Sequence, residues 1–216
     1  TERPVLRTAP APMFLLSKLV RESGIKSVLT GEGADEVLAG YDIFREAKIR
    51  RFWAREPESV CRPQLFDRLY PYLARAPQQT KGMAQAFWKQ GLAEAGTAGF
   101  SHGPRWKTTA SIQRFFGADA AATLAAAPPA DVLASLPSAF HGWSPLAQDQ
   151  FLEIATLFGP YLISSQGDRM LMANSVEGRF PFLDIDVMEF CNGLPPSYKL
   201  RVLDEKHILK RVARDI

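Results

Sequence analysis

The sequence lacks the features that mark exported, membrane-spanning or nucleic-acid-binding proteins. It has two cysteines in 216 residues, Cys61 and Cys191, without metal-ligand spacing, which is typical of reduced thiols in a cytoplasmic protein. No apolar run approaches the ~18 residues of a membrane span, and no charged segment followed by an apolar one opens the chain. The net charge of +3 is mild and scattered, unlike the basic stripe of a dedicated nucleic-acid binder. We therefore expect a soluble cytoplasmic protein that binds neither membrane nor nucleic acid.

The chain has enough apolar material, 46% of its residues, for one large domain or a piece of one. It begins at Thr1 rather than Met and ends at Ile216 within a helical pattern, so we expect a part of a longer protein. Only residues 25–30 form a convincing central strand. A doubly wound sheet needs several parallel strands, so the rest of the sheet is expected upstream and this part should be mostly helical.

Helices are expected around that strand. An apolar stripe through Leu15 and Leu19, ended by Gly24 as a left-handed cap, predicts one before it. A second should run from Asp35 to about Glu56. Its basic residues are interpreted as a solvated face, with a phosphate-facing patch as the alternative: Arg45, Lys48, Arg50, Arg51 and Arg55. Residues 100–109 are interpreted as an ordered loop, and further helices are expected over 146–164, over 186–192 and from 204 onward.

The most informative segment is the loop that follows the strand, residues 30–36, TGEGADE. Ligands of open α/β folds sit outside the carboxyl ends of the strands, where this loop falls. Its glycines favour phosphate binding, but three carboxylates would repel a bare polyphosphate unless Mg²⁺ accompanies it. Glu32, between two glycines, could then act as a general base. The alternative is an acidic cap, with Asp35 and Glu36 favoured by the helix dipole.

A second candidate segment spans residues 168–184 and interleaves charges with large apolar groups. Such charges usually belong to a buried, hydrogen-bonded ion-pair network. That structural role is the prediction for Asp168, Arg169 and Arg179. Glu177 is kept as a candidate site residue.

A third candidate is Lys206, in the sequence DEKHILKR that starts at Asp204. If Asp204 caps a helix, Lys206 falls in the first turn, where the helix dipole is already positive. A lysine facing an anion would explain that placement, and a solvated lysine is the alternative. His207 has no second metal-type residue at helical spacing and is interpreted as a packed or surface side chain.

Together, these three segments resemble the synthetase domain of glutamine-dependent asparagine synthetases. The family pattern has a Ser/Thr-Gly-Glu-Gly-Ser/Ala-Asp-Glu loop, matched by residues 30–36. It then has Asp-Arg-x-x-Met-Ala-x-Ser-x-Glu-x-Arg-x-Pro-Phe-Leu-Asp, matched by residues 168–184 with Asn174 at a usual His. Glu-Lys-x-x-Leu-Arg/Lys follows and is matched by residues 205–210. Residues 6–12 and 101–106 also look like one branch of the family, so the resemblance covers nearly the whole chain.

The resemblance implies an α/β fold of the adenine-nucleotide alpha-hydrolase (PP-loop) type, with residues 1–216 as the C-terminal part of the synthetase domain. It implies an ATP- and Mg²⁺-dependent ligase that activates aspartate as an acyl-adenylate, releases pyrophosphate, and forms asparagine with ammonia from glutamine. By similarity, Glu32 would be the base and Lys206 would neutralise charge on the phosphates. Asp35 would hold Mg²⁺ on pyrophosphate, and Thr30 and Gly31 would line the adenylate site.

Two parts of the family pattern do not occur in this sequence: the Ser-Gly-Gly-x-Asp-Ser phosphate loop and the glutaminase domain with its N-terminal catalytic cysteine. The resemblance implies a glutaminase domain as partner within a longer protein, and it is compatible with a homodimer. Two alternatives stay open. One is a related amidotransferase or cyclase with another carboxylate acceptor, although relatives that close β-lactams tend to have tyrosine at the position of Glu32. The other is a non-catalytic fragment that binds a partner.

Overall fold

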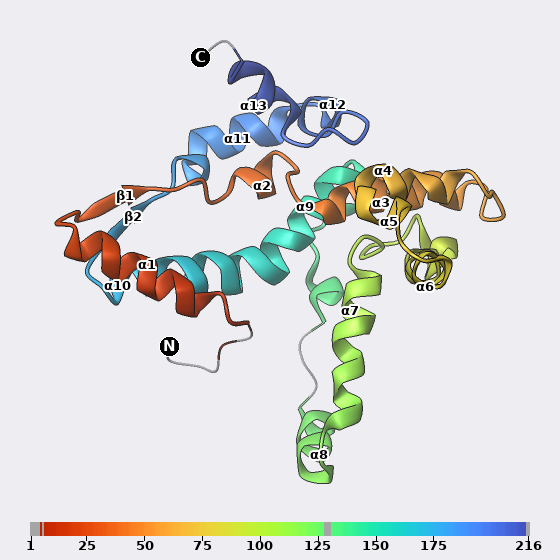
Figure 1. Ribbon diagram of the computed structural model, residues 1–216, viewed down its shortest axis with the longest axis horizontal. Helices are drawn as coiled ribbons and strands as arrows, with labels where there is room; N and C mark the ends of the chain where they lie inside the picture. The colour runs from red at the N-terminus through yellow and green to blue at the C-terminus, as the bar shows by residue number, and fades with distance from the viewer. Residues whose placement is uncertain (1–4, 6, 128–130, 215–216) are drawn as a thin grey trace. The chain divides into compact units, whose positions relative to one another are not determined.

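The computed structural model describes residue 5, residues 7–127 and residues 131–214. The chain divides into two compact units, one made of residues 1–40 and 150–216 and the other of residues 41–149. Each is mostly helical (Figure 1). None of the helices in the described residues has the length and apolar composition needed to cross a bilayer.

The unit that carries the predicted motifs is built on a two-stranded parallel sheet. Strand β1 (Ser27–Leu29) pairs with β2 (Glu177–Arg179), with Val28 opposite Gly178. The expected strand is therefore present, but its neighbour comes from within this chain, from a segment interpreted as an ion-pair network. A mostly helical chain with a small parallel sheet is compatible with the α/β class.

The rest of the first unit is mostly helical (Figure 1). Helix α1 begins at Pro10, and Gly24 follows its end with φ 81°. The sequence predicted this left-handed glycine. The run expected over 146–164 is helical but continues to residue 168 as a π-helix, a rare form. The elements are α1 (Pro10–Glu22), α2 (Ala34–Val37), π-helical η6 (Ile154–Asp168), α10 (Arg169–Met172), η7 (Pro181–Leu183), α11 (Ile185–Gly193), α12 (Pro196–Lys199) and α13 (His207–Val212).

The second unit consists of short helices around a buried arginine. Its elements are α3 (Asp42–Ala54), η1 (Arg62–Gln64), α4 (Leu65–Leu69), α5 (Pro71–Ala74), α6 (Gln78–Lys89), η2 (Leu92–Glu94), α7 (Gly103–Ala110), η3 (Ser111–Phe115), α8 (Ala118–Ala126), η4 (Val132–Ser135) and η5 (Phe140–Gly142). Helix α9 (Pro145–Glu153) runs across the boundary between the two units.

The basic residues of α3 do not form one solvated face. Arg50 is 2% exposed and donates to the backbone carbonyls of Trp88, Gln90 and Phe100 at 3.0, 2.6 and 2.7 Å. Burial is the largest cause that lowers its pKa to about 10. Arg51 donates two hydrogen bonds to the carboxylate of Asp149. These two charges hold the second unit together, so that expectation was wrong for them.

Two local predictions in this region were also wrong. The helix expected from Asp35 to Glu56 is interrupted, because α2 ends at Val37 and α3 begins at Asp42. The residue between them with a left-handed backbone is Ala39 (φ 57°), which gives no glycine or proline signal in the sequence. Residues 100–109 contain helix α7 from Gly103, with Pro104 in its first turn, where proline is favourable.

Candidate functional site

The loop after β1 is joined to the residues that follow β2. The backbone N–H of Thr30 donates to the carbonyl of Arg179 at 3.0 Å, which extends the strand pairing by one step. Beyond it, Gly33 lies against Leu183 of η7. Because the strands are parallel, their carboxyl ends meet at one edge, and residues 30–36 lie at that edge as the sequence predicted.

An apolar cluster fixes the end of this loop to the C-terminal helices. Val37 and Leu38 are 1% and 3% exposed, and they share a core with buried Cys191 of α11. The partly buried side chains packed against that core come from η7, α11, the segment after it, and α13: Phe182, Val187, Met188, Leu194, Ile208 and Leu209. Burial of this kind contributes about 1.5–3 kcal/mol per large side chain. The core therefore brings α13 beside α2, although about 170 residues separate them in the chain.

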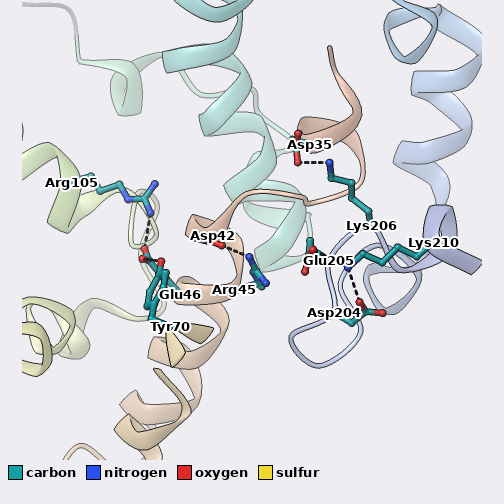
Figure 2. Close-up of polar contacts among 10 residues, drawn as sticks. All are labelled: Asp35, Asp42, Arg45, Glu46, Tyr70, Arg105, Asp204, Glu205, Lys206 and Lys210. Carbon is teal, nitrogen blue, oxygen red and sulfur yellow. Dashed lines mark hydrogen bonds and ion pairs between the residues drawn. The ribbon is translucent and has the colours of Figure 1, made fainter. Parts of the chain in front are cut away.

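This packing places Lys206 against Asp35. Lys206 Nζ lies 2.8 Å from Asp35 Oδ1, and both side chains are about one-third exposed (Figure 2). The backbone N–H of Lys206 also donates to the carbonyl of Leu38 at 3.2 Å. Two of the predicted site residues, from motifs far apart in the sequence, are thus in direct contact.

Lys206 reaches this position in a way that the sequence did not predict. It is not in the first turn of a helix capped by Asp204; it is the residue that precedes α13, with a left-handed backbone (φ 48°). Asp204 instead accepts from Lys210 Nζ at 2.9 Å and pairs with His207 Nδ1 at 2.6 Å. The hydrogen bonds from His207 and then Lys210 lower the pKa of Asp204. His207 is a half-buried side chain paired with this carboxylate.

Glu32 lies half-buried in the same loop. Burial first, and the charge of Asp35 second, raise the pKa of Glu32 above 4.5. Both effects disfavour the charged form, which makes the ionised carboxylate more ready to take up a proton. A raised pKa is one of the properties that a carboxylate needs to act as a general base at neutral pH.

Thr30 and Gly31 open the loop and differ in environment. The hydroxyl oxygen of Thr30 is buried and has no hydrogen-bond partner among the described residues. A buried polar atom without a partner is uncommon and is often satisfied by a ligand or water. Gly31 is exposed, and a Cβ built on it would meet nothing within 4 Å. The backbone there is open to close approach by another molecule.

Glu177 does not join this group in the structure. It begins β2 opposite Ser27, at the amino ends of the strands, and pairs with Arg179 of the same strand at 2.9 Å. Glu177, Arg179 and Asp168 are exposed, so the expected buried network of charges was wrong. Arg169 donates to Ser165 Oγ at 3.2 Å. A role for Glu177 in the site stays a prediction.

Sequence reasoning missed a buried pair that holds the backbone beneath the site. Gln150 Nε2 donates to the carbonyl of Glu36 at 2.5 Å, and Lys199 Nζ donates to Gln150 Oε1 at 3.3 Å. Gln150 is 5% and Lys199 3% exposed, and burial lowers the pKa of Lys199. Neither residue belongs to a motif or a recognisable spacing, so only the fold reveals them.

The described residues contain no cluster of three or more His, Cys, Asp or Glu side chains that could enclose a metal ion. A cation can be bound by fewer protein carboxylates than that where a bound ligand supplies the other oxygens. Mg²⁺ is commonly bound in that way, through one or two carboxylates and phosphate oxygens.

An open hollow of about 950 Å³ also lies in the first unit, between the start of α1 and α10. Its lining residues are Val5, Arg7, Thr8, Pro10, Ala11, Phe14, Leu15, Arg169, Met170, Met172 and Ala173. The predicted site residues are all absent from this lining, so the hollow and the loop 30–36 are separate features.

The glycines of the site region allow a direct test of how Gly33 shapes the loop. Gly33 has φ 93°, and an added Cβ would lie 2.4 Å from Leu183 Cδ2. We expect Gly33→Ala to lower the free energy of unfolding by at least about 1 kcal/mol more than Gly24→Ala, because overpacking adds to backbone strain. Gly24 (φ 81°) has open space around it, and Gly193 has neither strain nor crowding. Urea unfolding of the three variants measures this, and equal losses for Gly33→Ala and Gly24→Ala would contradict the packing of the loop on Leu183.

Comparison with known proteins agrees with this arrangement of motifs. The family model described as asparagine synthase matches residues 1–216. The chain is 31% identical over 221 residues to a putative glutamine-hydrolysing asparagine synthetase of Mycobacterium tuberculosis. The aligned region covers 100% of this chain and 31% of the relative. It is 27% identical over 214 residues to a glutamine-hydrolysing asparagine synthetase of Bacillus subtilis, covering 99% of this chain and 32% of the relative.

A protein named amidase chyE, from Penicillium rubens, is 30% identical over 228 residues, covering 92% of this chain and 31% of the relative. No solved structure matches the chain. The chain belongs to the asparagine synthase family. It spans about a third of the length of these relatives.

Proposed function

We propose that this chain is the C-terminal part of the synthetase domain of an ATP-dependent, amide-forming ligase. The carboxylate is aspartate and the nitrogen donor is ammonia released from glutamine. The carboxylate oxygen of aspartate attacks the α-phosphorus of ATP, pyrophosphate leaves, and ammonia then attacks the acyl carbon to give asparagine and AMP. The fold proposed for the complete domain is the α/β type of the adenine-nucleotide alpha-hydrolases (PP-loop).

The observation that carries this proposal is the contact between Asp35 and Lys206 at the end of β1, beside half-buried Glu32. One small region holds a carboxylate, an ammonium group and a carboxylate with a raised pKa. Adenylation needs a cation held on the departing phosphates, and amide formation needs a base for the attacking nitrogen. Asp35 and Lys206 would meet the first requirement, and Glu32 would meet the second.

The residues present fit ATP and Mg²⁺. Bound ATP supplies the adenylyl group, and Mg²⁺ neutralises charge on the departing pyrophosphate. Asp35 would hold the metal through its carboxylate, and Lys206 would turn from Asp35 to the phosphate oxygens. The Thr30 hydroxyl, which has no partner within the described part of the chain, and the open backbone at Gly31 would line the adenylate site. In the absence of these ligands, Asp35 and Lys206 neutralise each other.

The active protein is proposed to be longer than this chain. Its upstream part would supply the Ser-Gly-Gly-x-Asp-Ser phosphate loop and a glutaminase domain, neither of which occurs in these 216 residues. The chain length relative to its relatives, 31–32%, supports this.

The proposal is tested with the full-length protein, meaning this chain with its natural flanking segments. Aspartate, ATP, Mg²⁺ and ammonium are expected to give asparagine, AMP and pyrophosphate in equal amounts, measured by chromatography and mass spectrometry. Formation of ADP and phosphate, or no amide from any carboxylate, would overturn it. The 216 residues alone should not catalyse aspartate-dependent exchange of pyrophosphate into ATP, because they lack the phosphate loop; measurable exchange would contradict the proposed division of the site.

A different acceptor is the second candidate. The amidase of Penicillium rubens is as similar to this chain as the asparagine synthetases are, at 30% against 31% identity. Pyrophosphate exchange by the full-length protein, measured with a panel of carboxylates, separates aspartate from another acceptor. The preferred carboxylate should give the largest exchange rate. A third candidate, a non-catalytic subunit that binds a partner, predicts no exchange with any carboxylate.

A further inference from the structure

The turn that ends α2 places glycine in an unexpected position. Ala39 has the left-handed backbone (φ 57°) and is 0% exposed, while the N–H of Gly40 donates to the carbonyl of Asp35 at 2.8 Å. This six-residue closure is a common helix ending, in which glycine usually occupies the left-handed position. Here alanine occupies it, and Gly40 comes one residue later. Gly40 is not among the residues with positive φ, so the backbone does not require glycine there.

What Gly40 provides is space. A Cβ at this position would lie 1.8 Å from Asp35 Oδ1, 2.7 Å from Asp35 Cγ and 2.4 Å from Lys206 Cε. All three atoms belong to the two side chains that form the 2.8 Å ion pair. They are also the far ends of flexible side chains, which can move away at small cost to the fold. An added methyl group would therefore displace the ion pair more readily than it would unfold the chain.

We infer that Gly40 is a positioning residue. Because it has no side chain, the Asp35 carboxylate and the Lys206 ammonium can occupy the space beside it and form their ion pair. Any larger residue pushes the two groups apart and away from the place where they hold metal and phosphate. The catalytic consequence rests on the function proposed above. The effect on the ion pair does not, because it concerns the protein without ligands.

The first test measures the ion pair itself and needs no substrate. A water-soluble carbodiimide joins a carboxylate to an amine in direct contact, and both side chains are about one-third exposed to it. In the full-length protein, trypsin should then release a cross-linked peptide that connects residues 27–45 to residues 202–210. We expect Gly40→Ala to lose most of this product, while Gly193→Ala, at a glycine with open surroundings, keeps it. Undiminished cross-linking in Gly40→Ala would overturn the inference.

The second test measures the half-reaction. Gly40→Ala should lower kcat of pyrophosphate exchange by up to roughly 10²–10³-fold, the range for loss of one electrostatic contact, with little change in the KM for ATP. In a Lys206→Ala background the same substitution should cost no more than about threefold, because residues that act as a unit give non-additive losses. Equal losses in both backgrounds would contradict the inference. If cross-linking follows the prediction and no variant or parent shows exchange, the proposed function fails and the positioning of the pair stands.

A third measurement covers the case in which Gly40→Ala is poorly folded. Removing the clashing carboxylate with Asp35→Ala should then restore part of the lost melting temperature, because Asp35 makes the closest contacts with the added Cβ. A loss that is the same with and without Asp35 would show that Gly40 serves the backbone alone.

Discussion

Lys206→Ala in the full-length protein is expected to lower the rate of pyrophosphate exchange by roughly 10²–10³-fold, or about 3–4 kcal/mol of transition-state stabilisation. The ammonium group lies at the end of β1 and would meet negative charge that grows on the phosphates as pyrophosphate leaves. An interaction made mainly in the transition state lowers kcat and kcat/KM together and leaves ATP binding nearly unchanged. Exchange measured over a range of ATP concentrations separates these quantities.

The matched control is Lys210→Ala, four residues further along. Lys210 is also a lysine of this segment, but its partners are Asp204 and Glu205, at 2.9 and 2.8 Å. The Lys210→Ala variant should exchange pyrophosphate at the native rate. Lys206→Arg should restore only part of the rate, because a planar guanidinium replaces a compact ammonium, and because Lys206 Cε already lies close to Gly40. If Lys206→Ala exchanges pyrophosphate at the native rate, Lys206 is only the partner of Asp35.

Glu32→Gln should separate the two half-reactions. The amide keeps the shape of the side chain but cannot take a proton, so exchange should continue while amide formation falls by ~10²–10⁴-fold. Single-turnover measurement of AMP and asparagine in the same samples gives both rates. Glu189→Gln, at an exposed position of α11, is the control. If Glu32→Gln formed the amide at the native rate, Glu32 would not be the base, and a role in metal binding or structure would be favoured.

The raised pKa of Glu32 also predicts the sign of a stability effect. Between its ordinary pKa and the raised value, the folded protein keeps a proton that the unfolded chain has released. Folding stability contributed by this group therefore falls as the pH rises through that window. The glutamine in Glu32→Gln cannot ionise, so the free energy of unfolding of this variant should not show that decrease. Urea unfolding of both proteins at several acidic pH values measures the difference. An identical pH dependence in both proteins would show that Glu32 has an ordinary environment.

The sequence predicted the parts of the fold that depend on local chemistry. Helix α1 has its apolar stripe and its glycine cap, and β1 its short apolar run. Helix α11 begins where Asp184 accepts from the backbone N–H groups of Asp186 and Val187. Each of these signals lies within a few residues of the element that it defines.

The parts that were missed depend on distant partners. Strand β2 is three residues long and carries Glu177 and Arg179, so nothing but its pairing with β1 makes it a strand. Ala39 and Lys206 have left-handed backbones because the core around Val37 and Leu38 fixes α2 and α13 around them. Propensity gives no sign of either.

The candidate site divides in the same way. Residue type and spacing drew attention to the acidic loop with Glu32 and Asp35, and to Lys206. The roles predicted for these three residues come from the family resemblance. The contact between Asp35 and Lys206 needs the fold, as does the glycine that leaves room for it. Gln150 and Lys199 act through a single backbone carbonyl, which no sequence pattern records.

Aspartate labelled with ¹⁸O in its side-chain carboxylate tests the proposed acyl-adenylate most directly. One labelled oxygen attacks the α-phosphorus. When ammonia attacks the acyl carbon, the bond between that carbon and this oxygen breaks, and the oxygen leaves as part of AMP. The full-length protein with ATP, Mg²⁺ and ammonium should therefore release one labelled AMP for each asparagine formed, measured by mass spectrometry. Label found in inorganic phosphate together with ADP, or unlabelled AMP beside labelled asparagine, would show that the carboxylate is not activated by adenylation.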